Sequence, residues 1–292
     1  MKKITEKQNI ASSNINDLNI YDILCLINKE DAVIHGKIYN VLPLIEKLII
    51  SIVSCLNNGG RLFYIGCGTS GRLGVLDAAE CPPTFSTDHS LVQGIIAGGK
   101  KALYKSVENA EDNFEDAKNI IKNKVKKNDI VIGLSASGTS KFVLSGLKEA
   151  HKIKVKTGLI TCNLVKDLSY VDHLIKIIVG PEIITGSTRM KSGTATKMVL
   201  NMISTVSMIK MNKTYNNYMV DLKISNEKLF KRGINIICEI TGESKYNSMS
   251  YLKKTKGNVK LAIVMILLKI NKNKAKKLLK ENNENLNTII NN

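Results

Sequence analysis

The chain has 292 residues, 43% of them hydrophobic, and can therefore bury a sizeable core in about two domains at most. Charged residues make up 23% of the chain, and this composition excludes an intrinsically disordered or a collagen-like protein. The formal net charge of +18 would suit a nucleic-acid partner, but the lysines are spread along the chain without interleaved aromatic residues for base stacking. We therefore expect no nucleic-acid partner and attribute the charge to a biased composition.

The sequence predicts neither a membrane span nor a signal peptide. No apolar stretch reaches the roughly 18 to 20 residues that a spanning helix needs. Asn and Ser residues follow the basic N-terminus, where a signal peptide would carry an apolar core. The six cysteines form no Cys-x-x-Cys pair and the histidines are isolated, which predicts reduced thiols and no metal site. We expect a cytoplasmic protein without a membrane partner.

The N-terminal region, residues 1–51, is expected to be a helical segment. Asn16-Asp17 can cap a first helix, and apolar residues at helical spacing predict a second helix over 31–56. Pro43 is expected to break or kink this second helix, because proline lacks the N–H group that an inner helical turn needs.

The central region, residues 52–215, alternates short apolar runs with helical stretches. The runs are almost continuously apolar, which is typical of parallel strands buried on both faces. We expect strands over residues 61–65, 91–97, 129–134, 155–162 and 174–179. We expect helices that end at Ala79 and His151, and further helices over 110–126 and 191–211. The predicted fold class is α/β, a parallel sheet flanked by helices.

Residues 225–292 show no strand pattern and predict a small C-terminal helical domain. Its short amphipathic helices are separated by glycine turns at Gly242 and Gly257. The residues from 281 onward are polar and are expected to fray.

Two loops with the composition of anion-binding sites follow two of the predicted strands. The first is 66-GCGTSGR-72, and the second, in the same position after another strand, is 135-SASGTS-140. Backbone N–H groups at a helix N-terminus, together with Ser and Thr hydroxyls, form a nest for a phosphate. One such loop is explained by ordinary helix capping, but two at the carboxyl ends of strands in one sheet predict a shared phosphate site.

The first loop also contains the Gly-x-Gly-x-x-Gly pattern of dinucleotide-binding folds, at Gly66, Gly68 and Gly71. That alternative requires an acidic residue about 20 residues further on, at the end of the next strand. The next predicted strand ends at Ala97-Gly98-Gly99 without an acid, and the loop hydroxyls favour a phosphate monoester. We therefore expect no nicotinamide cofactor.

These loops resemble the sugar isomerase (SIS) domain, a fold that binds phosphosugars. The chain as a whole is similar to the N-acetylmuramic acid 6-phosphate etherase family, which is related to the glucokinase regulatory protein. The resemblance extends over nearly the whole chain and is carried by TEKQN near the N-terminus, 77-DAAECPPTF-85, 94-GIIAGG-99, 107-VENAED-112, 180-GPEIITGSTRMKSGTATK-197 and 257-GNVKLAIVM-265. The second loop departs from the family pattern, because Thr139-Ser140-Lys141 replaces the more usual Arg-Thr-Pro.

The resemblance implies a lyase of murein recycling that cleaves the D-lactyl ether at C3 of N-acetylmuramic acid 6-phosphate. In this family the products are N-acetylglucosamine 6-phosphate and D-lactate, formed by elimination and then addition of water. The resemblance further implies a cytoplasmic homodimer that needs no cofactor and whose partner is a small phosphosugar substrate.

Such an elimination needs one group that removes the C2 proton and another that protonates the departing lactate oxygen, and two carboxyl groups can supply both. The resemblance maps this catalytic pair onto Glu80, the proton donor, and Glu111, the second acid/base group. From spacing alone, Glu111 is better explained as a helix-start acid that complements the helix dipole, and Glu80 as a surface residue before Pro82-Pro83. The residues expected to bind substrate are Gly68, Thr69, Ser70, Arg72, Ser135, Ser137, Gly138, Thr139, Ser140, Ser187, Arg189 and Lys191.

Two other functions fit the same fold. A non-catalytic phosphosugar sensor, like the related regulatory protein, needs no acid/base pair, so the presence of both Glu80 and Glu111 argues against it. An aldose–ketose isomerase would share the phosphate loops but lack the sequence contexts of these two glutamates.

Overall fold

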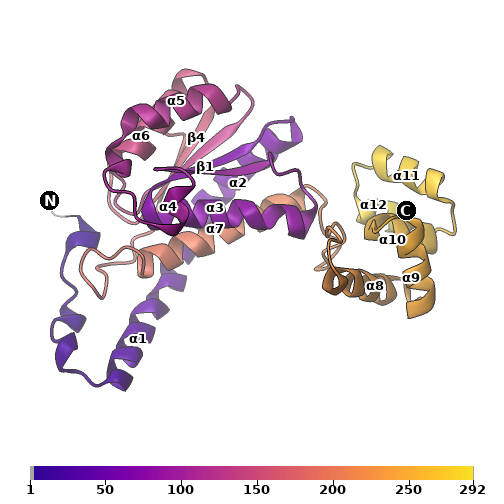
Figure 1. Cartoon of the computed structure of the whole chain (residues 1–292), viewed down its shortest axis with the longest axis horizontal. Coiled ribbons are helices and arrows are strands. Elements are labelled where there is room, and N and C mark those ends of the chain that lie inside the picture. The colour runs from indigo at the N-terminus through magenta and orange to yellow at the C-terminus, as the bar shows by residue number, and fades with distance from the viewer. Residues whose placement is uncertain (1–2, 292) are drawn as a thin grey trace. The chain divides into compact units, whose positions relative to one another are not determined.

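The computed structural model describes residues 3–291, which group into two compact units (Figure 1). The first unit comprises the residues up to 79 together with 90–204, and the second comprises 80–89 together with the residues from 205 onward. All strands of the described residues lie in the first unit, and the second unit is built from helices. The predicted α/β fold class is confirmed.

The first unit is organised around a parallel sheet whose strands run in the order β2-β1-β3-β4-β5. The strands are β1 Leu62–Gly66, β2 Val92–Ile96, β3 Ile130–Leu134, β4 Lys156–Thr161 and β5 His173–Lys176. Each strand matches one predicted apolar run, and β1 and β3 are buried along their whole length, as expected for strands covered on both faces. After β1 the chain forms β2 on one side of it, and β3 then lies on the other side, followed by β4 and β5. The topological switch point therefore lies between β1 and β3.

Helices cover both faces of this sheet. Figure 1 shows α5 and α6 on one face and α2, α3 and α7 on the other. On the α6 face, Phe142, Val143 and Leu147 pack together with Ile121 against the strands. The α-helices that begin in this unit are α1 Ile20–Tyr39, α2 Leu42–Asn57, α3 Gly68–Phe85, α4 Lys101–Tyr104, α5 Phe114–Lys124, α6 Lys141–Lys152 and α7 Lys191–Lys210. The short 3-10 helices are η1 Ile4–Glu6, η2 Ile10–Ser12, η3 Ile15–Asp17 and η4 Ala110–Asp112.

The second unit is helical, and no strand occurs among its described residues, as predicted. Its helices are α8 Glu227–Thr241, α9 Lys245–Lys254, α10 Val259–Leu267, α11 Lys272–Glu281 and α12 Leu286–Asn291. Helix α10 lies at the centre of the core, and Lys260 within it is buried. The Lys260 ammonium group donates to the Asp221 carboxylate at 2.8 Å and to the Asn212 carbonyl at 2.9 Å, which compensates its charge inside the core.

The predicted boundaries of the N-terminal helices are wrong, because the local capping signals lie elsewhere. Asn19, not Asn16-Asp17, caps α1, and its side chain accepts a hydrogen bond from the Asp22 N–H group. The chain leaves the helical conformation at residues 40–41, so the predicted helix from residue 31 is divided. Pro43 lies in the first turn of α2, where its missing N–H group costs no helical hydrogen bond.

Three further helix ends also differ from the prediction. The helix after the first loop does not end at Ala79 but continues to Phe85 through two prolines. The predicted helix over 110–126 is interrupted at Asn113, whose side chain caps α5. The C-terminal residues do not simply fray, because α12 places Leu286 and Ile289 in the core of the second unit.

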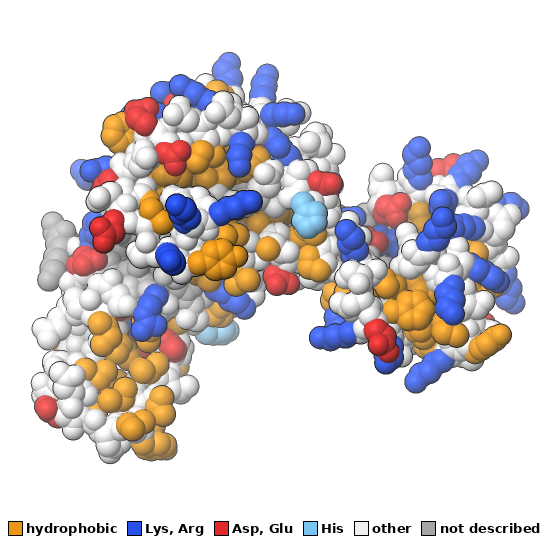
Figure 2. All heavy atoms as spheres, viewed as in Figure 1, with side chains coloured by type: hydrophobic (Ala, Val, Ile, Leu, Met, Phe, Trp, Pro, Cys, Tyr) orange, Lys and Arg blue, Asp and Glu red, His pale blue; other side chains and the backbone are white. Residues whose placement is uncertain are grey.

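No single helix of the described residues is long and apolar enough to span a membrane, and α1 with α2 reaches that length and composition only as a pair bent by 61°. Helix α1 leaves large apolar side chains exposed, among them Ile20, Tyr21 and Leu24. Figure 2 shows apolar side chains gathered on the surface that α1 forms, whereas Lys and Arg side chains are scattered over the visible face of the molecule.

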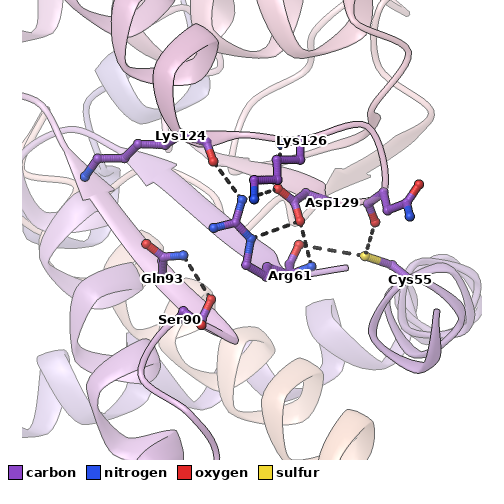
Figure 3. Close-up of polar contacts among 8 residues, drawn as sticks. Cys55, Arg61, Ser90, Gln93, Lys124, Lys126 and Asp129 are labelled. Atoms are coloured by element: carbon purple, nitrogen blue, oxygen red, sulfur yellow. Dashed lines mark hydrogen bonds and ion pairs between the residues drawn. The ribbon is translucent and has the colours of Figure 1, made fainter. Parts of the chain in front are cut away.

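An ion pair fastens the amino ends of β1 and β3 (Figure 3). Asp129 is buried, and its carboxylate accepts hydrogen bonds from the backbone N–H groups of Arg61 and Lys126 at 2.9 and 2.7 Å. The Arg61 guanidinium donates to the same carboxylate and to the Lys124 carbonyl, each at 2.7 Å. One side chain therefore holds the two strands and the turn before β3 together.

Cys55 of α2 lies beside this ion pair (Figure 3). Burial and the nearby Asp129 charge raise the pKa of the Cys55 thiol to about 11. The protonated thiol donates to the Asn128 carbonyl at 3.0 Å, so α2 is attached to the same turn.

Replacement of Asp129 by Ala should destabilise the fold by about 3 kcal/mol, because it leaves buried N–H donors without an acceptor and the Arg61 charge without its partner. Urea denaturation measures the change. The control is Asp167→Ala, which removes the 92% exposed partner of Lys176 and should change the free energy of unfolding by less than about 1 kcal/mol. Equal effects of the two substitutions would contradict this role of Asp129.

Candidate functional site

The loop after β1 enters α3 through two glycines in close contact. A side-chain carbon on Gly71 would lie 2.7 Å from Ile96 Cγ1 and 2.8 Å from the Gly66 carbonyl oxygen, so the turn closes only with glycine. This turn places Thr69 and Ser70 at the N-terminal end of α3, where backbone N–H groups have no partner within the helix.

The loop after β3 presents a row of hydroxyl groups. Ser135 Oγ lies 3.4 Å from Ser137 Oγ, which lies 3.2 Å from Thr139 Oγ1. Gly138 has a φ of +69°, and its N–H group donates to the Ser135 carbonyl at 2.9 Å, which gives the loop its tight turn. Ser140 ends the loop as the N-cap of α6.

The two loops contact each other through Cys67 and Ser140, whose sulfur and oxygen atoms lie 3.0 Å apart. Burial raises the pKa of the Cys67 thiol to about 11, although the hydrogen bond with Ser140 acts in the opposite direction. A raised pKa favours the protonated thiol at neutral pH, and the observed contact of this thiol is the one between the two loops.

Both loops open into one cavity of about 450 Å³ at the carboxyl ends of β1 and β3. This volume is typical of a small-molecule site, and the switch point is the place where open parallel sheets bind ligands. The predicted site residues that line the cavity are Gly68, Thr69, Ser70, Glu111, Ser135, Ser137, Thr139 and Ser140. Gly138 shapes the loop without lining the cavity.

Acidic and basic side chains complete the lining. Glu111 lies in η4 and is exposed at the cavity. The neighbouring Asp112 pairs with Lys141 at 3.1 Å, with both side chains more than half exposed, so this pair is weak. Lys3 and Glu6 come from the N-terminal segment.

Sequence reasoning assigned no role to nine of the lining residues, and four of these lie far in the sequence from the two loops and η4: Lys3, Glu6, Gly186 and Thr188. Glu6 stands within the TEKQN stretch, and Gly186 and Thr188 stand within 180–197, so the motifs contained the signal without a role for these positions. Lys3 carried no sequence signal that distinguishes it from the other lysines.

Other predicted residues near the loops do not line the cavity. The Arg72 guanidinium donates to the carbonyls of Leu103 and Lys105, each at 3.3 Å. Ser187 is half-buried and Arg189 is exposed, and both lie outside the lining, which takes Thr188 from the same segment instead.

Lys191 is buried and forms contacts within the first unit. Its ammonium group donates to the Glu30 carboxylate at 2.5 Å, and its backbone N–H group donates to the buried Glu182 carboxylate at 2.9 Å. Burial alone would raise the pKa of Glu30, but hydrogen bonds from Lys191 and Asn9 outweigh it and lower the pKa. These contacts join α1 to the start of α7.

Of the two predicted catalytic carboxyl groups, the structure places Glu111 at the cavity. Glu80 is exposed in the last turns of α3 and groups with the second compact unit, whereas the cavity lining belongs to the first.

A 2-1-3-4-5 parallel sheet with two hydroxyl-rich loops at its switch point is the arrangement of a SIS-type phosphosugar-binding protein. Residues 44–151 match the glucokinase regulatory protein N-terminal SIS domain, and residues 216–257 match the C-terminal lid domain of glucokinase regulatory protein. An Escherichia coli CFT073 protein, solved as a ligand complex, aligns with a TM-score of 0.50 at 22% identity over 68% of this chain and 95% of that one. A candidate phosphosugar isomerase from Bacteroides fragilis aligns at 0.53 and 18% identity over 70% and 98%, respectively.

Curated relatives define the family more closely. The chain is 49% identical to the N-acetylmuramic acid 6-phosphate etherase of Clostridium botulinum (strain Eklund 17B / Type B), over 99% of this chain and 96% of the relative. The identity is 47% to the Clostridium beijerinckii etherase, over 95% and 92%, and 44% to the Staphylococcus epidermidis etherase, over 98% of each. The chain belongs to the N-acetylmuramic acid 6-phosphate etherase family, which confirms the resemblance seen in its sequence.

Asp77 attaches the helix that carries the first loop to its neighbours. The Asp77 carboxylate accepts hydrogen bonds from the Tyr64 hydroxyl of β1 at 3.1 Å and from the Ser204 hydroxyl of α7 at 2.9 Å. Burial raises the pKa of Asp77 to about 6, although these two hydrogen bonds lower it. The folded protein therefore binds a proton in a pH range where the unfolded chain has already released it.

The sign of the pH effect follows from this raised pKa. Between the ordinary pKa of aspartate, about 4, and the folded value of about 6, stability should fall as the pH rises, and the loss is complete above that range. Asp77→Asn removes the titrating group, so the stability of this variant relative to wild type should increase from about pH 4 to about pH 6.5 in urea denaturation. A difference that is constant over this range would contradict the assignment.

The loop hydroxyls should contribute directly to ligand binding. Replacement of both Ser70 and Ser137 by Ala removes one hydroxyl from each loop and should raise KM about ten-fold or more, since each lost hydrogen bond to a charged group is worth about 1.5 to 3 kcal/mol. Ser169→Ala, an exposed residue outside the cavity, is the control and should leave KM unchanged. Unchanged kinetics in a folded double variant would remove these loops from the site.

Proposed function

We propose that the protein cleaves the D-lactyl ether bond of N-acetylmuramic acid 6-phosphate and releases N-acetylglucosamine 6-phosphate and D-lactate. The strongest support is the 44–49% identity to etherases over 95–99% of the chain. The cavity at the switch point adds a site of suitable chemistry, with hydroxyl groups for a phosphate and a carboxyl group beside them.

The substrate's phosphate is assigned to the two loops. Thr69 and Ser70 offer hydroxyls and backbone N–H groups at the start of α3, and the Ser135–Thr139 row offers further hydroxyls. Phosphate oxygens accept hydrogen bonds from such groups, and the positive end of the helix dipole favours the anion. With the phosphate held there, the sugar ring extends into the remaining cavity, toward Glu111.

The reaction proposed is an elimination followed by a hydration. A base removes the proton at C2 beside the aldehyde of the ring-opened sugar, the C3–O bond breaks, and the departing lactate oxygen takes a proton. Water then adds at C3, and C2 regains a proton. Glu111, which lines the cavity, and Glu80, assigned from the family resemblance, are the proposed acid/base pair. No redox or electron-accepting cofactor enters this sequence of steps.

The second candidate is a non-catalytic phosphosugar sensor. Matches to both the SIS domain and the lid domain of the glucokinase regulatory protein favour it. The near full-length etherase relatives favour the enzyme. Incubation with N-acetylmuramic acid 6-phosphate separates the two, because only the enzyme releases D-lactate.

The homodimer and the cytoplasmic location stay predictions from the family resemblance. The exposed Ile20, Tyr21 and Leu24 on α1 support self-association, since monomeric proteins rarely expose clustered apolar side chains. The mass in solution by light scattering measures the oligomeric state directly.

Substitution of either proposed acid/base residue should reduce turnover strongly. Glu111→Gln and Glu80→Gln keep the size of the side chain but cannot exchange the proton, so each should lower kcat by at least ~10²-fold while phosphosugar binding is largely kept. Glu115→Gln is the matched control, since Glu115 pairs with Lys118 on the nearby α5 and lies outside the cavity lining.

Solvent deuterium gives an independent check of the same mechanism. In D₂O the enzyme should place deuterium at C2 of the N-acetylglucosamine 6-phosphate product, because elimination removes that proton and hydration restores one from solvent. Direct displacement at C3 would leave C2 unlabelled. An unlabelled product together with active Glu111→Gln and Glu80→Gln variants would overturn the mechanism.

A further inference from the structure

The first described residues of the chain are fastened to the wall of the cavity. Asn163, which follows β4 and is 1% exposed, accepts a hydrogen bond from the Ile4 N–H group at 2.6 Å. Its amide nitrogen donates to Thr5 Oγ1 at 2.9 Å and to the Ala136 carbonyl at 3.0 Å. Because Ala136 belongs to the second phosphate-type loop, one buried amide joins η1 to that loop.

The 180–197 segment provides further contacts to η1. The Gly186 N–H group donates to the Thr5 carbonyl at 3.1 Å, and Thr5 itself is fully buried. Glu6 Oε2 lies so close to Gly186 that a side-chain carbon at that glycine would be 3.2 Å from it. Residues 4–6 are thus fastened to the cavity wall, and Glu6 itself lines the cavity.

This attachment brings Lys3 to the end of the hydroxyl row. Lys3 Nζ donates to Thr139 Oγ1 at 2.6 Å, and Thr139 Oγ1 lies 3.2 Å from Ser137 Oγ. The ammonium group is therefore in direct contact with the loop that we assign to the phosphate, although the two residues are 136 positions apart in the sequence.

The charges around the cavity make this contact significant. Lys141 also lines the cavity, but its ammonium group pairs with Asp112 at 3.1 Å. Arg72 donates to backbone carbonyls and Lys191 pairs with Glu30. Among the residues that the structure describes, Lys3 is the cavity-lining cation that forms no ion pair with a carboxylate. A phosphate monoester carries about −1.5 to −2 charge at neutral pH and favours such a cation.

We propose that Lys3 binds the phosphate group of the sugar phosphate, beside Thr139, and that the N-terminal segment is therefore part of the substrate site. The chemical class of this ligand rests on the proposed function. Lys3 is a binding residue in this proposal, and Asn163 is a positioning residue that acts through η1.

The first test measures binding of N-acetylglucosamine 6-phosphate by calorimetry, since this sugar carries the phosphate but no lactyl carboxylate. Lys3→Met should weaken its binding about ten-fold or more, as expected for the loss of a charge-assisted hydrogen bond. Lys7→Met is the matched control, because Lys7 is exposed on the same segment and does not line the cavity. Equal affinities of wild type and Lys3→Met would overturn the proposal.

The second test introduces a cation at position 139 and, separately, removes the Asn163 side chain that holds η1. Thr139→Arg in the Lys3→Met background places a cation on the loop itself and should recover part of the lost affinity. Asn163→Ala releases η1 and should weaken binding of the same sugar phosphate. The double variant Asn163→Ala/Lys3→Met should bind the sugar phosphate no more weakly than whichever single variant has the lower affinity. Additive losses would show that Asn163 does not act through Lys3 and would overturn its positioning role.

These outcomes are separable from the proposed function. If wild type binds the sugar phosphate but releases no D-lactate from the muramic substrate, the etherase proposal fails while the binding comparison still decides the role of Lys3. If wild type releases D-lactate and Lys3→Met binds and turns over as wild type does, only the Lys3 proposal fails. Absence of sugar-phosphate binding by wild type would overturn both.

Discussion

The parallel pairing of β1 with β3 is the constraint on which the site depends. Gly66 pairs with Leu134 at the ends of these strands, so the two loops begin at the same level on adjacent strands. The Arg61–Asp129 ion pair holds the opposite ends of the same two strands. Because register is a property of the whole strand pair, a clamp at the amino ends also aligns the hydroxyl-rich loops at the carboxyl ends. The ion pair that stabilises the strand pair therefore also sets the relative position of the two loops, across five residues of each strand.

The sequence alone was sufficient for the strands of the sheet and for the position of the two hydroxyl-rich loops at one edge of it. Buried parallel strands require continuous apolar runs, and a loop that binds an anion at a strand end requires small and hydroxyl residues, so both leave local signals. Helix ends depend on single capping side chains, and here Asn19 and Asn113 decided boundaries that apolar periodicity placed elsewhere. Family resemblance, not spacing, distinguished Glu111 from an ordinary helix-start acid.

The partners of charged side chains could not be predicted from sequence, because the two partners are often far apart in the sequence and meet only in the folded chain. Arg72 and Lys191 both stand beside motifs that favour phosphate binding, yet the first meets backbone carbonyls and the second meets Glu30, 161 positions away. Lys3 shows the converse case, a residue without any local signal that reaches the cavity through the contacts of Asn163. The contacts of these three side chains depend on the tertiary structure, which composition and periodicity alone do not predict.

The net charge of +18 and the single contact of Lys3 act on an anionic substrate in different ways. A diffuse positive field raises the rate of encounter and is screened by salt over about 8 to 10 Å at physiological ionic strength. A cation in hydrogen-bond contact with the binding loop discriminates between ligands, because it meets the phosphate directly. The second loop lacks the arginine of the family pattern, and its own Lys141 is paired with Asp112. Lys3 from the N-terminal segment therefore adds, beside Lys141, a cation that forms no ion pair with a carboxylate among the described residues.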